Sequence, residues 1–244
     1  LGEATKFSRF LLDADKTYEA LIKLGYTSST GDTEGEIVKN KNNDLPKPAD
    51  LKKVLNNFIG EINQLPPMYS ALKHQGKPLY AFAREGVNIH REKRPIVIYK
   101  LDLMSYEKDL LRVLVKCSKG TYLRVLAEDI GVELGVGGYL MGLRRTEIGT
   151  LNIKESISLE ALEKMQNEER LRLLRPVSTL TAGFNNISLS RENVALIKNG
   201  QELIINNKEA GYYSLFDSCD NFFGVGDLNK DCVLKVKRLM STQN

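Results

Sequence analysis

Residues 95–134 read PIVIYKLDLMSYEKDLLRVLVKCSKGTYLRVLAEDIGVEL and decide the class of fold. The runs 95–106 and 110–117 are rich in β-branched and aromatic residues, and a short polar segment separates them, which predicts a β-hairpin. In 121–134 apolar residues recur at helical spacing, which predicts a helix. The apolar face consists of Leu123, Leu126, Ala127 and Ile130. A hairpin followed by an amphipathic helix indicates a fold that mixes α and β structure.

The flanking segments extend this pattern. Residues 17–26 alternate between apolar and polar side chains, and 139–151 return to a β-rich texture, so we expect a strand in each. Helical spacing predicts a helix over 48–59, with Pro48 in its first turn and Gly60 just past its end. The other elements expected in this part are a polar loop over 27–36 and a short helix over 78–84.

The C-terminal part of the sequence has a different pattern of helices and short β-rich runs. Ser158 suits the N-cap of a helix over 159–174, and Ser190 suits the N-cap of a helix within 188–198. Three short β-rich runs follow, separated by turns that contain Asn and Asp. They span 212–217, 221–228 and 232–239. We therefore expect the last 65 or so residues to form a small β-barrel-like domain, which lies within the usual range of domain sizes.

Composition places the chain among globular proteins. Of its 244 residues 42% are hydrophobic and 27% are charged, which excludes a disordered chain. No window of the sequence approaches the roughly 18 consecutive apolar residues of a membrane-spanning helix, so we expect no membrane association. Three separated cysteines and two histidines offer no cluster of metal ligands. We therefore expect no metal, no disulfide and a reducing, cytoplasmic location.

Positive charge is concentrated in one stretch. Residues 68–100 hold seven basic and two acidic side chains, so this stretch is more positive than the whole chain, whose net charge is +4. Aromatic residues are interleaved with these cations: Tyr69, Tyr80, Phe82 and Tyr99. Cations among aromatic rings suit a polyanion that also offers stackable bases, as RNA does. A solvated basic surface with a few half-buried tyrosines explains the same composition equally well.

Several short strings carry the functional signal, and none of them is a G-x-S-x-G elbow, a P-loop or a dinucleotide fingerprint. In chain order they are L-G-E-A-T-K-F at 1–7, D-K-T-Y at 15–18, P-P-M-Y-S-A-L-K at 66–73, G-K-P-L-Y at 76–80, A-R-E-G at 83–86, S-K-G-T-Y-L-R at 118–124, L-R-R at 143–145 and F-F-G-V-G at 222–226. Together they resemble the TruB family of bacterial tRNA pseudouridine-55 synthases. Ordered matches at family-like spacing are far more specific than any one string.

The resemblance implies an enzyme that isomerises uridine-55 in the T-loop of tRNA to pseudouridine. It implies no metal and no organic cofactor, because the reaction has no redox change. The implied fold is α/β, with a pseudouridine-synthase catalytic domain over 1–178 built on a mixed, mostly antiparallel sheet. A PUA-like RNA-binding domain over 179–244 follows, and a basic insert at about 68–95 embraces the T-loop. We expect tRNA as the partner of a monomer that requires no protein partner.

One feature of the family is missing from this sequence. The family nucleophile is an aspartate in a G-T-L-D-P loop just ahead of the segment that 1–7 resembles, and no G-T-L-D-P string occurs here. Asp13 and Asp15 belong to other matched segments and cannot replace it. The chain also starts at Leu1 rather than Met. We therefore expect that an N-terminal part with the aspartate is missing and that these residues alone are inactive.

The resemblance also assigns roles to individual residues. Tyr18 is the expected platform for the flipped-out uracil and is expected to serve in the final removal of the C5 proton. Arg124 is the expected partner of the nucleophilic aspartate, and Leu143 an apolar wall of the uracil pocket. Without the aspartate, we expect Arg124 to face an empty place and the chain around it to be disordered. The residues expected to contact RNA are Tyr69, Lys73, His74, Lys77, Arg84, Tyr122, Arg144 and Arg145.

Two other functions remain open on the sequence. A non-catalytic RNA-binding protein or tRNA-folding chaperone would hold the T-loop with the same residues. A guide-RNA-dependent homologue would carry the same core within a ribonucleoprotein. Turnover of free tRNA distinguishes the stand-alone enzyme from both.

Overall fold

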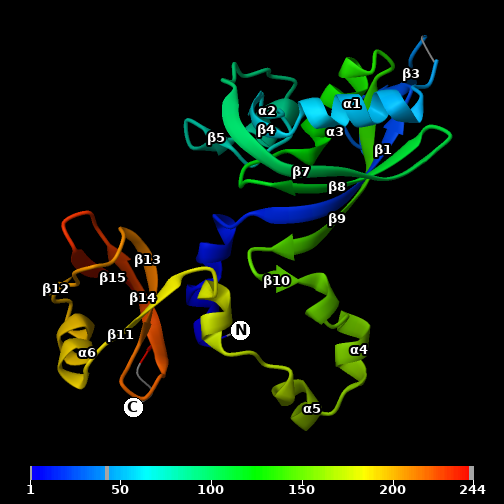
Figure 1. Ribbon diagram of the computed structural model, residues 1–244. Helices are drawn as coiled ribbons and strands as arrows, with labels where there is room; N and C mark the ends of the chain where they lie inside the picture. The colour runs from blue at the N-terminus through cyan, green and yellow to red at the C-terminus, as the bar shows by residue number, and fades with distance from the viewer. Residues whose placement is uncertain (1, 42–43, 242–244) are drawn as a thin grey trace. The chain divides into compact units, whose positions relative to one another are not determined.

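The computed structural model describes residues 2–41 and 44–241 (Figure 1), so Leu1, the first residue of the string at 1–7, lies outside the described residues. Within them, packing divides the chain into two compact units. The larger unit contains residues 15–148 and 152–154, and the smaller contains residues 2–14, 149–151 and 155–241. The domain boundary proposed from the sequence stays a prediction.

A six-stranded sheet forms the base of the larger unit. The pairings of β9 with β1, β1 with β8, β8 with β7 and β7 with β4 are all antiparallel, as the family resemblance implies. In spatial order the strands are β10 (Leu151–Asn152), β9 (Gly138–Ile148), β1 (Lys16–Leu24), β8 (Leu110–Cys117), β7 (Arg94–Glu107) and β4 (Gly60–Gln64). The predicted hairpin is confirmed as β7 and β8, and the predicted strand at 17–26 is confirmed as β1.

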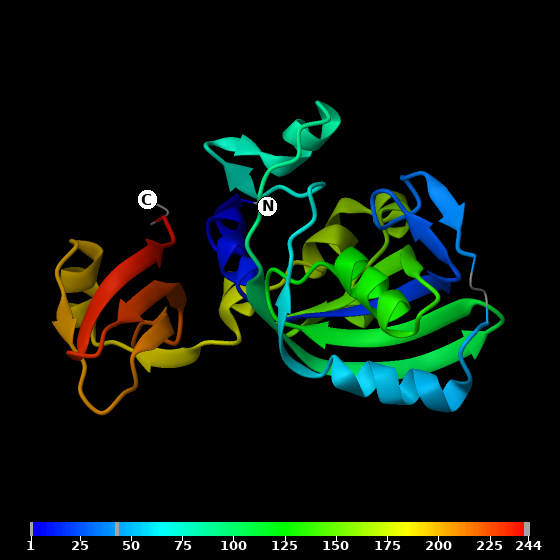
Figure 2. The same ribbon diagram turned by 90° about the horizontal axis from the view of Figure 1, so that it is seen from above.

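Two helices, α1 (Pro48–Asn57) and α3 (Leu123–Glu133), cover one face of this sheet (Figures 1 and 2). Both were predicted, and α1 begins at Pro48 as expected. Their apolar faces pack on the side chains of β1, β7 and β8 that point to the same side, and this packing forms the main core. Burial of these aliphatic side chains stabilises the unit and fixes the position of α3.

Gly131 brings α3 close to the start of β9. A Cβ atom at this position would collide with the backbone of Gly137 and Gly138, and no flexible side chain is there to move aside. Because glycine leaves that space open, the helix packs directly against the chain that enters β9. The contact fixes the distance between α3 and β9, which both carry predicted site residues.

Two small hairpins extend from the larger unit. Strands β2 (Tyr26–Ser28) and β3 (Ile37–Lys39) form a hairpin with a loop at 29–36, so the polar loop predicted at 27–36 starts later than predicted. Strands β5 (Lys73–His74) and β6 (Lys77–Pro78) precede α2 (Leu79–Arg84), which confirms the short helix predicted at 78–84. Figure 2 shows β5, β6 and α2 projecting beyond the end of the sheet. This projecting segment carries much of the basic stretch.

The smaller unit contains a five-stranded sheet in the order β11–β13–β14–β15–β12. The bounds of its strands are β11 (Asn185–Ser188), β12 (Leu203–Ile204), β13 (Gly211–Phe216), β14 (Phe222–Leu228) and β15 (Val233–Leu239), with helix α6 (Arg191–Lys198) capped by Ser190 as predicted. Two 3₁₀ helices, Gly2–Lys6 and Ser8–Leu12, belong to the same unit. Phe7, which lies between these two helices, contacts Phe222, and Phe10 of the second helix contacts Phe184. The N-terminal string therefore completes an aromatic cluster on this sheet.

The single helix predicted over 159–174 is wrong. The structure has two short helices, α4 (Leu159–Lys164) and α5 (Asn167–Arg172), although Ser158 caps the first as expected. The backbone N–H of Gln166 donates to the Glu169 carboxylate at 2.9 Å. That bond starts a new helix, because it satisfies a donor that a continuous helix would have used internally.

Further differences concern strands. The strands that were not predicted are β2, β3, β4, β5, β6, β11 and β12. The strand predicted over 139–151 breaks between β9 and β10. Gly149, with a φ of 55°, makes that break. Glycine adopts this left-handed conformation without the steric penalty that other residues meet.

Candidate active site

Arg124 lies in the first turn of α3 and has partners. Its Nη1 donates to Asp32 Oδ2 at 3.1 Å and to the carbonyl oxygen of Thr30 at 3.4 Å. Its Nη2 donates to the carbonyl oxygen of Tyr69. The expectation that Arg124 faces an empty place is therefore wrong, because the Asp32 carboxylate compensates its charge, and the reason given for local disorder no longer applies.

Asp32, which sequence reasoning missed, is held firmly in the loop between β2 and β3. Its Oδ1 accepts hydrogen bonds from the Thr30 hydroxyl at 2.7 Å and from the Glu34 backbone N–H at 3.1 Å. Asp32 also forms a parallel bridge with Leu140 of β9, next to a 2.9 Å bond from Leu140 N to the carbonyl of Gly31. Both carboxylate oxygens are therefore engaged, which fixes the orientation of the carboxylate toward Arg124.

Leu143 and Arg124 line one hollow of about 280 Å³. Leu143 lies on β9 and is 49% exposed, so about half of its surface is accessible to a molecule in the hollow. The other lining residues are Asp32, Thr33, Glu34, Leu140, Met141 and Gly142. The hollow thus combines an ion pair with an apolar side, as a site for a planar polar base requires.

The register of β1 against β9 places Tyr18 close to Leu143. Tyr18 pairs with Arg145, and Ala20 pairs with Leu143, without a bulge between these pairs. Side chains two positions apart on a strand share a face, so Tyr18, Leu143 and Arg145 point to the side covered by α3. Tyr18 is half-buried against the main core and is not among the residues that line the hollow.

Burial raises the pKa of Tyr18, and the neighbouring Cys117 adds to this effect while the Arg145 guanidinium opposes it. The phenol is therefore neutral at physiological pH and presents an uncharged aromatic ring. A neutral ring beside the hollow suits stacking on a base.

Arg144 and Arg145 lie on opposite faces of the sheet. Arg145 shares the face of Tyr18, whereas Arg144 pairs with Glu19 on the other face. Both side chains are exposed. The structure therefore brings only Arg145 of the two to the side of the sheet that carries Arg124.

The N-terminus of α3 is held from outside the helix. The Gln64 side chain accepts from Tyr122 N at 2.8 Å through Oε1 and donates to the Tyr122 carbonyl at 3.1 Å through Nε2. Tyr122 is the N-cap of α3 and has no side-chain cap of its own. Its backbone thus has a defined structural contact, whereas the predicted contact of Tyr122 with RNA stays a prediction.

Glu128 lies one turn after Arg124 on α3 and faces the same loop. Its carboxyl group approaches Gly31 so closely that a Cβ there would lie 3.1 Å from Glu128 Cδ. Burial raises the pKa of Glu128, and the nearby Asp129 adds to the effect while Arg124 opposes it. The neighbourhood of Arg124 thus holds a second carboxyl group, Glu128, whose charged form is disfavoured by burial.

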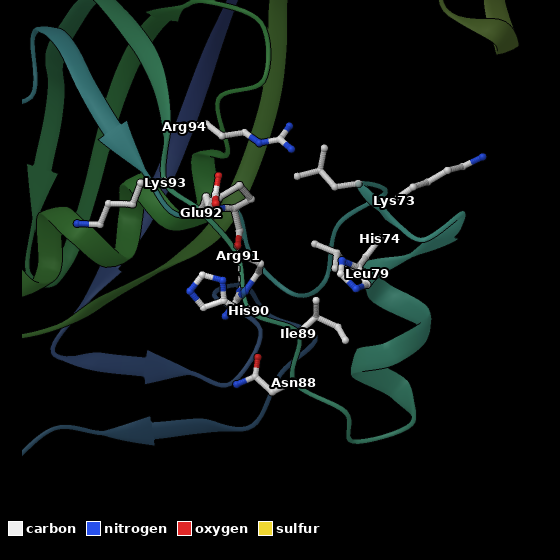
Figure 3. Close-up of a pocket in the computed structure, with 12 residues that line it drawn as sticks. Lys73, His74, Leu79, Asn88, Ile89, His90, Arg91, Glu92, Lys93 and Arg94 are labelled. Carbon is white, nitrogen blue, oxygen red and sulfur yellow. Dashed lines mark hydrogen bonds between the residues drawn. The ribbon is translucent and has the colours of Figure 1, made fainter.

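The basic stretch surrounds a cavity of about 580 Å³ (Figure 3). Lys73 and His74 line it from β5, and residues 88–94 line it from the returning segment. In Figure 3 the Arg94 guanidinium extends toward the space between these segments, and Lys93 points away from it. Arg91 Nη1 donates to the carbonyl of Pro66 at 2.9 Å, which ties the returning segment to the outgoing one.

Two other predicted RNA contacts have partners within the projecting segment. Lys77 bonds the Glu85 carboxylate at 2.6 Å and lies over the ring of Phe82. Arg84 lies over the ring of Tyr80, 5.4 Å from its centroid. These contacts are exposed and therefore weak, so a phosphate can compete for either cation. Residues 90–94, which add three basic side chains and a histidine, were counted in the basic stretch but were not singled out.

The described residues hold no group of three His, Cys, Asp or Glu side chains that could bind a metal ion. None of the helices they form combines the length and apolar character that a membrane crossing requires.

Comparison with known proteins identifies the family. Residues 1–123 match the model of the N-terminal domain of TruB family pseudouridylate synthases. The chain belongs to the TruB family. The tRNA pseudouridylate synthase B C-terminal domain model matches residues 124–181, and the C-terminal model of pseudouridine synthase II TruB matches 186–240. The resemblance drawn from the short strings is thereby confirmed.

Curated TruB relatives are similar over almost the whole chain. The tRNA pseudouridine synthase B of Azoarcus sp. (strain BH72) is 48% identical over 99% of this chain and 80% of that protein. The tRNA pseudouridine synthase B of Aromatoleum aromaticum is 44% identical over 99% of this chain and 78% of that protein. Among solved structures, a Cbf5-Nop10-Gar1 complex has a chain with a TM-score of 0.74 at 21% identity, covering 99% of this chain and 71% of that one. That likeness confirms the fold.

Proposed function

We propose that this TruB family member isomerises uridine-55 in the T-loop of tRNA to pseudouridine. The observation that carries the proposal is the 48% identity, over 99% of the chain, to a protein named tRNA pseudouridine synthase B. The hollow that joins Arg124, Asp32 and Leu143 supports it from the structure. The activity class is that of an intramolecular transferase, or isomerase, and it requires no redox cofactor.

The target base leaves the RNA stack and enters the hollow in this proposal. Flipping a nucleotide out of the stack costs a few kcal/mol, which contacts in the pocket partly recover. Leu143 forms an apolar wall, and the neutral ring of Tyr18 stacks on the uracil. When C5 has been joined to the sugar, the Tyr18 hydroxyl relays the C5 proton: its oxygen accepts that proton while its own proton passes to solvent water.

Arg124 positions the carboxylate that attacks the target nucleotide. A guanidinium has five N–H donors, and the bonds to Asp32, Thr30 and Tyr69 use three of them among the described residues. Two donors are left for a second carboxylate, which they would keep ionised and oriented. Asp32 holds Arg124 rather than attacking, because both of its oxygens already accept hydrogen bonds.

The phosphates of the T-loop contact the basic side chains of the projecting segment. The proposed contacts are Tyr69, Lys73, His74, Lys77 and Arg84, with Tyr122 and the two arginines of β9, Arg144 and Arg145, nearer the sheet. Of the two arginines, Arg145 is favoured for the target strand because it shares the face of Tyr18. Arg144 points to the opposite face and is favoured for a more distant phosphate.

Residues 179–244 form a PUA-like RNA-binding domain in this proposal, and residues 1–178 the catalytic domain. The match of residues 186–240 to a C-terminal TruB model supports a separate C-terminal domain over 179–244. The two 3₁₀ helices that pack on the C-terminal sheet imply that residues 2–14 stabilise the RNA-binding domain. We propose a cytoplasmic monomer that needs no protein partner.

The test is a single-turnover assay with the polypeptide as its gene encodes it and tRNA labelled with tritium at C5 of uridine. We expect tritium release from unmodified tRNA and none from a tRNA with cytidine at position 55. Arg124→Ala should abolish release and leave tRNA binding within about twofold. Tight binding without release would favour a tRNA chaperone, and release that depends on an added guide RNA would favour the ribonucleoprotein homologue.

A further inference from the structure

Gln64 makes a buried polar contact in the larger unit that the proposed chemistry does not use. It is the last residue of β4 and is 3% exposed. Its side-chain amide meets both polar backbone groups of one residue, Tyr122. A backbone N–H can only donate and a carbonyl can only accept, so these partners fix which way the amide points.

The contact holds the N-cap residue of α3 itself, at the backbone N–H that the N3 side chain of a capping box would bind. The first N–H groups of a helix lack partners inside the helix, and Ser, Thr, Asn or Asp at the N-cap usually provides one. Tyr122 cannot do this with its side chain. Gln64 instead fixes the Tyr122 peptide groups from a neighbouring strand, while the Tyr122 carbonyl also accepts the first helical bond from Leu126 N at 3.1 Å.

The same segment reaches the start of α3 a second time, at Arg124. Five residues after Gln64, the Tyr69 carbonyl accepts from Arg124 Nη2. The segment from 64 to 69 therefore touches the first turn of α3 at the backbone of Tyr122 and at the side chain of Arg124. It then leads directly into the projecting basic segment, whose return strand begins at Arg94, the register partner of Gln64.

We infer that Gln64 is a positioning residue for the reaction: by holding both backbone groups of Tyr122 it sets the start of α3 and hence the position of Arg124. The inference rests on the proposed function for its catalytic consequence. It requires no contact between Gln64 and the substrate. Gln64 thus joins the end of β4 to the helix that carries Arg124.

The main test is Gln64→Met, which keeps the size of the side chain and removes both hydrogen bonds. We expect the single-turnover rate constant to fall about 10- to 100-fold, because a displacement of about 1 Å in a reacting group can slow a reaction 100-fold. The dissociation constant for tRNA should change less than about twofold, since the basic segment is untouched. Loss in turnover without loss in binding separates positioning from recognition.

A matched control separates positioning from stability. Ile62 lies on the same strand and packs against the main core, so Ile62→Ala destabilises the unit and leaves the Gln64 contact in place. We expect Ile62→Ala to lower the melting temperature and to keep the wild-type rate constant at a temperature where it is folded. An equal loss of rate in Ile62→Ala and Gln64→Met would overturn the inference.

A second measurement needs no catalysis. In NMR spectra of the protein without RNA, the Tyr122 amide and the Arg124 guanidinium protons should exchange with water faster in Gln64→Met than in wild type or Ile62→Ala. Unchanged exchange would overturn the inference even if the enzyme were active. If the wild-type protein had no activity at all, the proposed function would fail and this measurement would still decide whether Gln64 holds the helix. Should Gln64→Met not fold, Gln64→Asn keeps an uncharged amide but shortens its reach to Tyr122, and it allows the same comparisons.

Discussion

Replacing Asp32 by Asn tests the central ion pair of the site. The change keeps the shape of the side chain and removes its negative charge. The Arg124–Asp32 pair has an N–O distance of 3.1 Å, with the two side chains 23% and 22% exposed. Arg124 would retain the carbonyl groups of Thr30 and Tyr69 as acceptors. The substitution therefore loosens the guanidinium without releasing it.

The size of the effect follows from the kind of bond that is lost. A hydrogen bond to a charged group contributes about 1.5–3 kcal/mol, and partial exposure to solvent places this pair in the lower part of that range. Since each 1.4 kcal/mol corresponds to about a factor of ten, the single-turnover rate constant should fall roughly 10- to 30-fold. Binding of tRNA should stay within about twofold, because Asp32 provides no positive charge for a phosphate.

The assay is tritium release from C5-labelled tRNA under single-turnover conditions, with binding measured separately. Asp102→Asn is the control, because the Lys100–Asp102 pair is of the same type but lies at an exposed site, with side chains 55% and 48% exposed. We expect the control to match wild type. A wild-type rate for Asp32→Asn would refute the positioning role. Complete inactivation would instead identify Asp32 as the attacking group. It would contradict the argument that Asp32 does not attack because both of its oxygens accept hydrogen bonds.

Three further outcomes are expected. Gly131→Ala should lower the free energy of unfolding by about 2 kcal/mol in urea titration, because overpacking outweighs the gain of about 1 kcal/mol in helix propensity. Gly183→Ala is the control and should be near neutral, because a Cβ at Gly183 has no atom within 4 Å. Burial raises the pKa of Cys117 to about 11, so Cys117 should resist alkylation at pH 8 while the exposed Cys219 reacts; equal labelling of both thiols would contradict this. Because the folded state holds the Cys117 proton more tightly than the unfolded state does, the contribution of Cys117 to stability should be lost as the pH rises through about 11. Lys73→Ala should reduce the salt dependence of tRNA binding by about one in the logarithmic slope, and Lys77→Ala, already paired with Glu85, by less; an unchanged slope for Lys73→Ala would exclude it as a phosphate contact.

Local patterns predicted the elements that carry the site. The helix that holds Arg124 follows from apolar spacing within 14 residues, and the β7–β8 hairpin follows from two adjacent runs. Such patterns are readable because each element buries one face, and periodicity reports that face directly. The functional strings then indicated which residues of these elements matter.

Partnerships between distant residues were not predictable in the same way. Asp32 and Arg124 are 92 residues apart in the chain, and their contact depends on the loop after β2 bridging to β9 at Leu140. In the sequence Asp32 is one acidic residue in a polar loop, like its neighbour Glu34. The burial of Gln64 is equally invisible, because a polar residue at the end of a strand is usually exposed. One available signal was missed: Gln166 and Glu169, three residues apart, mark the helix start that divides 159–174.

Two contacts position α3, one at its start and one near its end. Gln64 holds the start of the helix, and Gly131, seven residues after Arg124, lets it pack directly on the backbone of Gly137. Seven residues correspond to about 10 Å along a helix. If a larger residue at position 131 pushes α3 away from β9 while Gln64 still binds Tyr122, the helix rotates about its start, and Arg124 moves little. Gly131→Ala should therefore reduce stability more than turnover, whereas Gln64→Met should reduce turnover more than stability. If both variants lose turnover in proportion to stability, the Gln64 contact does not fix the start of α3 for catalysis, and Asp32 alone positions Arg124.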